Sequence, residues 1–160
     1  MIGKKFLFLR SDKNVTDFVN RSSAKTKEKA LEFIKRINTE FENRNSFYWK
    51  MTERNTDKII GSICLWNFSK DKKTAEIGYD LIPNHQGKGI MTKSLKNITE
   101  FGFQKLNLEL IEAYTYHKNE NSKKILERNG FKLVYGRKDA DNENNVIYEL
   151  KKPAANILYK

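Results

Sequence analysis

The spacing of apolar residues changes near the middle of the chain, and no other feature of the sequence constrains the fold as strongly. Before residue 82, three runs rich in apolar and aromatic residues, at 47–51, 59–66 and 75–81, are separated by polar turns. Short runs of this kind, bounded by turn residues, are typical of β-strands. The first half of the chain therefore predicts a three-stranded antiparallel meander.

Helical spacing dominates after this point. Met91, Leu95, Ile98 and Phe101 recur every three or four residues, as they would on one face of a helix from about residue 89 to 105. The other predicted elements are a helix at 26–41, a strand at 110–116, a helix at 119–129 that ends at Gly130, and strands at 131–135 and 146–150. A βαβαβ alternation joined to a meander predicts the α/β (α+β) class.

The bulk properties are those of one globular domain. A chain of 160 residues without a repeat or a linker predicts a single domain over 1–160, with residues 151–160 as a tail that packs on the domain or on a second copy. Cys64, the only cysteine, lies in an apolar run and is expected to be a buried core thiol. No apolar run is long enough for a membrane span or a signal peptide, so we expect no membrane partner and a cytoplasmic location.

The net charge of +11 favours acidic partners, such as nucleic acid, a ribosome surface or a phosphorylated cofactor. No nucleic-acid-binding motif accompanies this charge. Neither His85 nor His117 has cysteine or acidic neighbours at a spacing suited to a metal, so no metal site is expected.

The most informative segment is 76–91, in which a strand leads through a glycine turn into a helix. The first amides of a helix lack partners within the helix, and Gly87 and Gly89 would let the backbone approach a phosphate closely. Lys88 would add a positive charge. The P-loop pattern is absent, and Thr92 stands where the dinucleotide fingerprint needs its third glycine. On this evidence alone, a pyrophosphate cradle and a plain turn remain alternatives.

Two segments together resemble the GNAT (GCN5-related) N-acetyltransferases. The run 86–91, QGKGIM, resembles that family's Q/R-x-x-G-x-G/A signature, with Met91 in place of the last small residue. The run 119–131 resembles its second landmark, N-x-x-S followed by a helix that ends in G-F. A helix and a strand lie between the two segments, as in the family. The closest branch is the RimJ/RimL-like enzymes, which are named for the modification of ribosomal-protein N-termini.

The resemblance implies a mixed, mostly antiparallel sheet with a splayed strand pair, flanked by helices, and acetyl-CoA as the cofactor. The main chain of Leu81 and Ile82 would pair with pantetheine, and Asn119 would reach the cofactor from the other side of the gap. The CoA pyrophosphate would be held by the backbone amides of the turn together with one hydroxyl: Gln86, Gly87, Lys88, Gly89, Ile90, Met91 and the Thr92 hydroxyl.

Two residues are candidates for the chemistry. An amine that attacks a thioester must first lose its proton, and Glu76, at the start of the cofactor-facing strand, is the candidate base. Ser122 is implied to lie near the sulfur and is the candidate donor to the leaving thiolate. Leu126 stands where many GNAT enzymes carry a tyrosine acid, which strengthens the interpretation of Ser122. The region 1–15 is short compared with the first strand of the family.

The resemblance leaves three functions open. The first is acetylation of a protein N-terminal α-amine of the ribosomal-protein type, with ribosome association. The second is acetylation of a small amine, such as a polyamine, an amino acid or an amino sugar. The third is a non-catalytic CoA-binding module. Monomer and homodimer are both consistent with the sequence.

Overall fold

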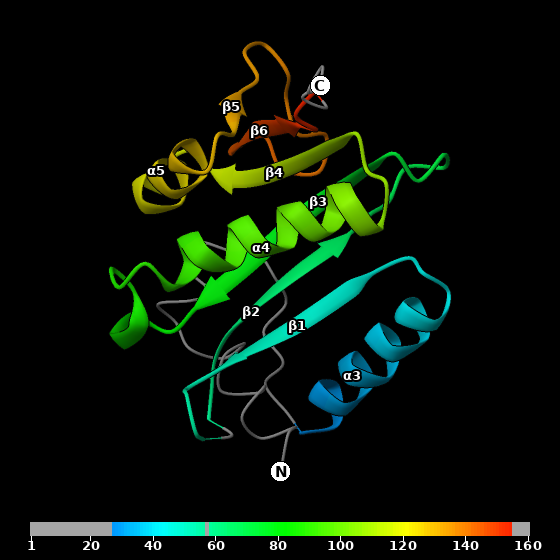
Figure 1. Ribbon diagram of the computed structural model, residues 1–160, viewed down its shortest axis with the longest axis vertical. Coiled ribbons are helices and arrows are strands. Elements are labelled where there is room, and N and C mark those ends of the chain that lie inside the picture. The colour runs from blue at the N-terminus through cyan, green and yellow to red at the C-terminus, as the bar shows by residue number, and fades with distance from the viewer. Residues whose placement is uncertain (1–26, 57, 155–160) are drawn as a thin grey trace, which may run out of the picture.

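The computed structural model describes residues 27–56 and 58–154, which form a six-stranded sheet with three α-helices (Figure 1). In chain order the elements are α3 (Lys27–Glu42), β1 (Phe47–Thr52), β2 (Ile59–Trp66), β3 (Thr74–Leu81), the 3₁₀ turn η1 (Pro83–His85), α4 (Ile90–Lys105), β4 (Leu110–Tyr116), α5 (Glu120–Arg128), β5 (Lys132–Leu133) and β6 (Asn145–Lys151). The region 1–15, Thr26 at the start of the predicted helix 26–41, and most of the tail lie outside the described residues.

The strand order is β1-β2-β3-β4-β6-β5. The meander is confirmed, since β1 pairs with β2 and β2 with β3, both antiparallel. Of the expected βαβαβ alternation, only β3–α4–β4 joins two parallel strands, and β6 pairs antiparallel with both β4 and β5. The sheet is therefore mixed and mostly antiparallel, as predicted.

The two parallel strands separate after a short contact. β3 and β4 are paired only through Thr74–Leu110, Ala75–Ile111 and Glu76–Glu112. The segments 77–81 and 113–116 then continue without being paired to each other. This is the splayed strand pair that the resemblance implied, and it opens toward the end of β3 from which the chain enters α4.

α4 and α5 cover one face of the sheet, and α3 lies beside β1 at its edge (Figure 1). The core lies under α4, where Leu65, Leu95 and Ile111 are fully buried. Gly102 allows the close approach of helix and sheet, because an added Cβ would lie 3.1 Å from the Ile111 side chain. Cys64 is buried, as predicted.

The strand predicted at 131–135 is shorter than expected. Residues 131–135 contain only the two-residue strand β5, after which the backbone turns at Gly136, with φ of 77°. The side chain of Tyr135 is 87% exposed, so it has no place on a buried strand. In the part of the chain described here, no helix is both long and apolar enough to cross a membrane.

Candidate functional site

The chain leaves β3 through a turn that contains two left-handed glycines. η1 is followed by Gly87 and Gly89, whose φ angles are 73° and 74°. A side chain in this backbone region is strained, which explains glycine at both positions. A Cβ added to either residue would meet no atom within 4 Å, so the space above the turn is open. Lys88 lies between them with an exposed side chain.

The start of α4 offers its amides to this open space. Gly89 is the N-cap, and no side chain caps the helix. Hydrogen bonding back to the turn begins at Lys93, whose amide donates to Gly89 O at 3.0 Å. The amides of Ile90, Met91 and Thr92 therefore precede the first bonded turn, where the helix dipole adds partial positive charge. Open space, left-handed glycines and uncapped amides fit a diphosphate group. Met91 is buried in the core.

Gln86, Leu81 and Ile82 connect the turn to the strand. The Gln86 side chain donates from Nε2 to Leu81 O at 2.9 Å, which fastens the turn to the end of β3. Ile82 is bonded on both sides, since its amide donates to Ile60 O and its carbonyl accepts from the His85 amide. Main-chain groups of successive strand residues point in opposite directions. The main chain of Leu81 therefore points toward the gap, and the expected pairing with pantetheine rests on Leu81 more than on Ile82.

A pair of hydroxyls joins the first turn of α5 to β3. Asn119 caps α5, and its Oδ1 accepts from the Ser122 amide at 3.1 Å. This cap orients the first turn of α5, in which Ser122 is 9% exposed. Ser122 Oγ lies 2.7 Å from Tyr79 Oη, so a hydrogen bond crosses from α5 to β3. Burial raises the pKa of Tyr79 to about 12, which keeps the phenol protonated near neutral pH.

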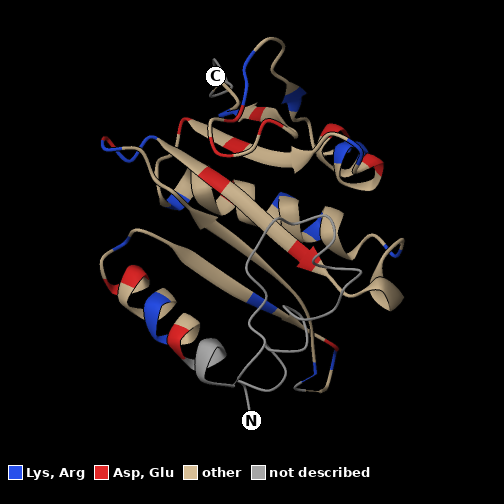
Figure 2. Ribbon diagram, turned by 180° about the vertical axis from the view of Figure 1, so that it is seen from behind, with Lys and Arg blue, Asp and Glu red and all other residues tan. Residues whose placement is uncertain are grey.

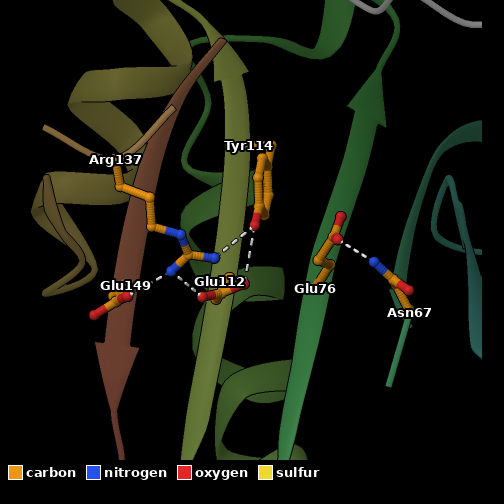
Figure 3. A network of polar contacts seen from close by, with 6 residues as sticks. All are labelled: Asn67, Glu76, Glu112, Tyr114, Arg137 and Glu149. Atoms are coloured by element: carbon orange, nitrogen blue, oxygen red, sulfur yellow. Dashed lines mark hydrogen bonds and ion pairs between the residues drawn. The ribbon is translucent and has the colours of Figure 1, made fainter. Parts of the chain in front are cut away.

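Glu76 lies on the face of β3 opposite to Tyr79, and it belongs to the last residue pair before β3 and β4 separate. The Asn67 side chain donates to its carboxylate through Nδ2 (Figure 3). Burial raises the pKa of Glu76, the Asn67 hydrogen bond opposes this, and the negative charges of Glu112, Asp139 and Asp141 raise it further. A carboxylate with a raised pKa is a better proton acceptor than an ordinary surface glutamate.

Three carboxylates form a row across the sheet, in register with Glu76. Glu76 pairs with Glu112 of β4, and Glu112 pairs with Glu149 of β6. Figure 2 shows the face concerned, on which acidic residues mark β3, β4 and β6. Arg137 reaches the row from the loop before β6 and lies 2.5 Å from Glu112 and 3.0 Å from Glu149. Among the described residues, no cation forms an ion pair with Glu76.

This fold and geometry are those expected of a class of protein that binds a diphosphate at a helix N-terminus and holds a carboxylate and a hydroxyl pair beside a gap between two parallel strands. Comparison with known proteins makes the class specific. The model of the acetyltransferase (GNAT) domain matches residues 4–132. The chain belongs to this family, and it is an N-acetyltransferase of the GNAT type that uses acetyl-CoA.

Individual relatives of the chain are also acetyltransferases by name. The chain is 27% identical over 121 residues to the uncharacterized N-acetyltransferase YoaA of Bacillus subtilis, covering 76% of this chain and 68% of that protein. It is 34% identical over 89 residues to the ribosomal-protein-serine acetyltransferase of Escherichia coli, covering 56% and 50%. The solved ribosomal-protein-S5-alanine acetyltransferase of Vibrio fischeri has the same fold, with a TM-score of 0.80, 24% identity and coverage of 93% and 88%.

Sequence reasoning missed the contact of Tyr79 with Ser122 and the place of Glu112 beside Glu76. Alternation along β3 places Tyr79 on the face of Ile77 and Leu81, under the helices, and this signal could have suggested contact with α5. The row of carboxylates required the register between β3, β4 and β6, which connects residues far apart in the sequence. No local pattern in the chain reports that register.

Proposed function

We propose that this chain acetylates the N-terminal α-amine of a protein, of the ribosomal-protein type. The observation that carries the proposal is the placement of Glu76 at the opening of the splayed strands, without a cation partner among the described residues and with a raised pKa. An α-ammonium group has a pKa near 8, against about 10 for an alkylamine. A carboxylate can therefore deprotonate an α-amine at neutral pH more readily than it can an alkylamine.

In the proposed reaction, Glu76 accepts a proton from the acceptor ammonium, directly or through one water. The amine nitrogen then attacks the thioester carbonyl carbon, the C–N bond forms, and the carbonyl oxygen becomes an oxyanion, which the Leu81 amide would stabilise by a hydrogen bond. Breakage of the C–S bond returns the carbonyl and releases a thiolate. In the same step Ser122 Oγ–H protonates the departing sulfur, and Ser122 Oγ takes up the second proton that the amine nitrogen loses, while Tyr79 Oη, hydrogen-bonded to Ser122 Oγ, stays protonated.

Supporting this assignment, the ribosomal-protein-serine acetyltransferase of Escherichia coli is a relative. The positive charge of the chain also suits a neighbourhood of ribosomal RNA. We extend the proposal to transient ribosome association by a monomer or homodimer in the cytoplasm. Cosedimentation with ribosomes that weakens steeply as salt rises would support this extension, and cosedimentation at no salt concentration would refute it.

A second candidate is acetylation of a small polycationic amine. The carboxylates of Glu112, Asp139 and Asp141 act on Glu76 and give this face a local negative charge, although the whole chain is positive. Such a face attracts cations whether they are peptides or polyamines.

An acceptor panel separates the functions. Release of CoA thiol would be followed with peptides that carry a free N-terminus, the same peptides blocked at the N-terminus, free lysine and polyamines. The proposal predicts turnover only with free N-termini, and greater turnover on polyamines would select the second candidate. Stabilisation by CoA without turnover on any acceptor would indicate a non-catalytic module.

A further inference from the structure

The row of carboxylates raises the question of why two acids face each other at the opening of the gap. Directly opposed like charges on neighbouring strands are destabilising. Glu112 is nevertheless buried, with 8% of its surface exposed, and it lies between Glu76 and Glu149. An arrangement that costs stability beside a reaction centre is a candidate for a functional role.

Glu112 is held by two donors that Glu76 lacks. Arg137 donates through Nη1 to Glu112 Oε1 at 2.5 Å, and Tyr114 donates through Oη to Glu112 Oε2 at 3.1 Å. Arg137 also donates through Nη2 to Tyr114 Oη at 2.8 Å, which closes a ring of three side chains (Figure 3). Both carboxylate oxygens of Glu112 are therefore occupied by protein donors.

Glu76 has a different environment on every described side. Asn67, at the end of β2, supplies a neutral donor. From β4, Glu112 presents a negative charge, and from the loop before β6, Asp139 and Asp141 present two more. Arg137 donates its hydrogen bonds to Glu112, Glu149 and Tyr114, and none of these bonds reaches Glu76. The two opposed carboxylates are thus unequal, since both oxygens of Glu112 accept from protein donors, whereas the described residues give Glu76 one donor, Asn67.

We infer that Glu112, clamped by Arg137 and Tyr114, is a positioning residue for acetyl transfer that makes Glu76 the proton acceptor. The inference rests on the proposed function. Glu112 takes no proton itself. Its fixed charge increases the proton affinity of Glu76 and attracts the ammonium group to the opening, while the clamp prevents Glu112 from competing for the same proton.

The test compares two isosteric variants. Glu112→Gln removes the charge that faces Glu76 but keeps an amide oxygen able to accept from Arg137. Glu149→Gln is the matched control, because it makes the same change on the same arginine, one strand further from Glu76. The Glu76 carboxyl carbon would be followed by NMR as a function of pH in both variants and in the wild type, without any acceptor.

We expect the Glu76 titration to move to lower pH by about 0.5 unit or more in Glu112→Gln, and to stay unchanged in Glu149→Gln. The acid limb of kcat/KM for the acceptor should move by the same amount.

Three results would overturn the inference. One is a Glu76 titration that is the same in Glu112→Gln and the wild type. Another is a shared proton, seen when both carboxyl carbons titrate together in the wild type. The last is a folded Glu112→Gln protein that loses turnover while Glu76→Gln keeps it, because Glu112 would then be the base. If the wild type acetylates no amine, the proposed function fails, but the NMR titration still decides whether the two carboxylates are coupled.

Discussion

The hydrogen bond between Tyr79 and Ser122 gives the proposed chemistry its sharpest test, through Tyr79→Phe. The two oxygens are 2.7 Å apart, and removal of Tyr79 Oη leaves Ser122 Oγ without this partner. A hydrogen bond between neutral groups contributes about 0.5–1.5 kcal/mol, and a factor of ten in rate corresponds to about 1.4 kcal/mol. If the bond helps Ser122 to donate to the thiolate, kcat should fall about threefold to tenfold.

Ser122→Ala removes the donor itself and should lower kcat by about 100-fold, in the range of general acid catalysis, with little change in CoA affinity. The double variant should be no slower than Ser122→Ala alone, since Tyr79 acts through Ser122. Tyr148→Phe is the matched control, because it also removes a buried phenol that donates a hydrogen bond, to Glu127 at 2.9 Å, away from the site. The assay is acetyl transfer at saturating acetyl-CoA.

Wild-type kcat in Tyr79→Phe would refute the reasoning. A double variant whose loss equals the product of the two single losses would also refute it, because the two hydroxyls would then act independently. An equal loss in Tyr148→Phe would assign the effect to general destabilisation.

Three further predictions concern the turn, the base and the meander. Gly89→Glu should weaken CoA binding by at least about 100-fold in calorimetry, because its carboxylate would face the diphosphate. Gly136→Glu is the control, since it introduces the same charge at a glycine with a similar positive φ, and it should bind CoA normally. Glu76→Gln should raise Tm at pH 7. Because folding raises the pKa of Glu76, the protonated side chain favours the folded state, and this stabilisation is lost as the pH rises above that pKa. Glutamine is neutral at every pH, so the variant should gain stability at pH 7. Below about pH 4 the wild-type side chain is protonated as well, and the difference in Tm should vanish. Gly61→Ala should cost about 3 kcal/mol in denaturant unfolding, since its Cβ would overlap the Asp80 carbonyl oxygen.

Strands and helices followed from the sequence where apolar spacing was regular. The predicted strands 59–66 and 110–116 coincide with β2 and β4, because each is a dense apolar run that the core buries. The strand predicted at 131–135 was wrong in length, since edge residues such as Tyr135 keep contact with water and are not fixed by burial. The spacing of apolar residues predicts which strands are buried, but it does not predict the length of a strand at the exposed edge of a sheet.

Some residues of the candidate site could likewise be predicted from the sequence, and others could not. Gly87 and Gly89 could be found from sequence because the positive φ that the turn needs is a local requirement, which glycine meets. The contact of Tyr79 with Ser122 and the row from Glu76 to Glu112 join residues 43 and 36 positions apart. Such contacts depend on strand register and helix docking, which one sequence does not encode as a local pattern.

We propose that the turn from Gly87 to Thr92 binds the diphosphate of CoA through its backbone amides. Titration of ¹⁵N-labelled protein with CoA tests it most directly. We expect the amide protons of residues 87–92 to move downfield together and to saturate with CoA, because they form new hydrogen bonds to phosphate oxygens. If CoA saturates the protein while these amides keep their positions and the shifts lie elsewhere, the claim is contradicted.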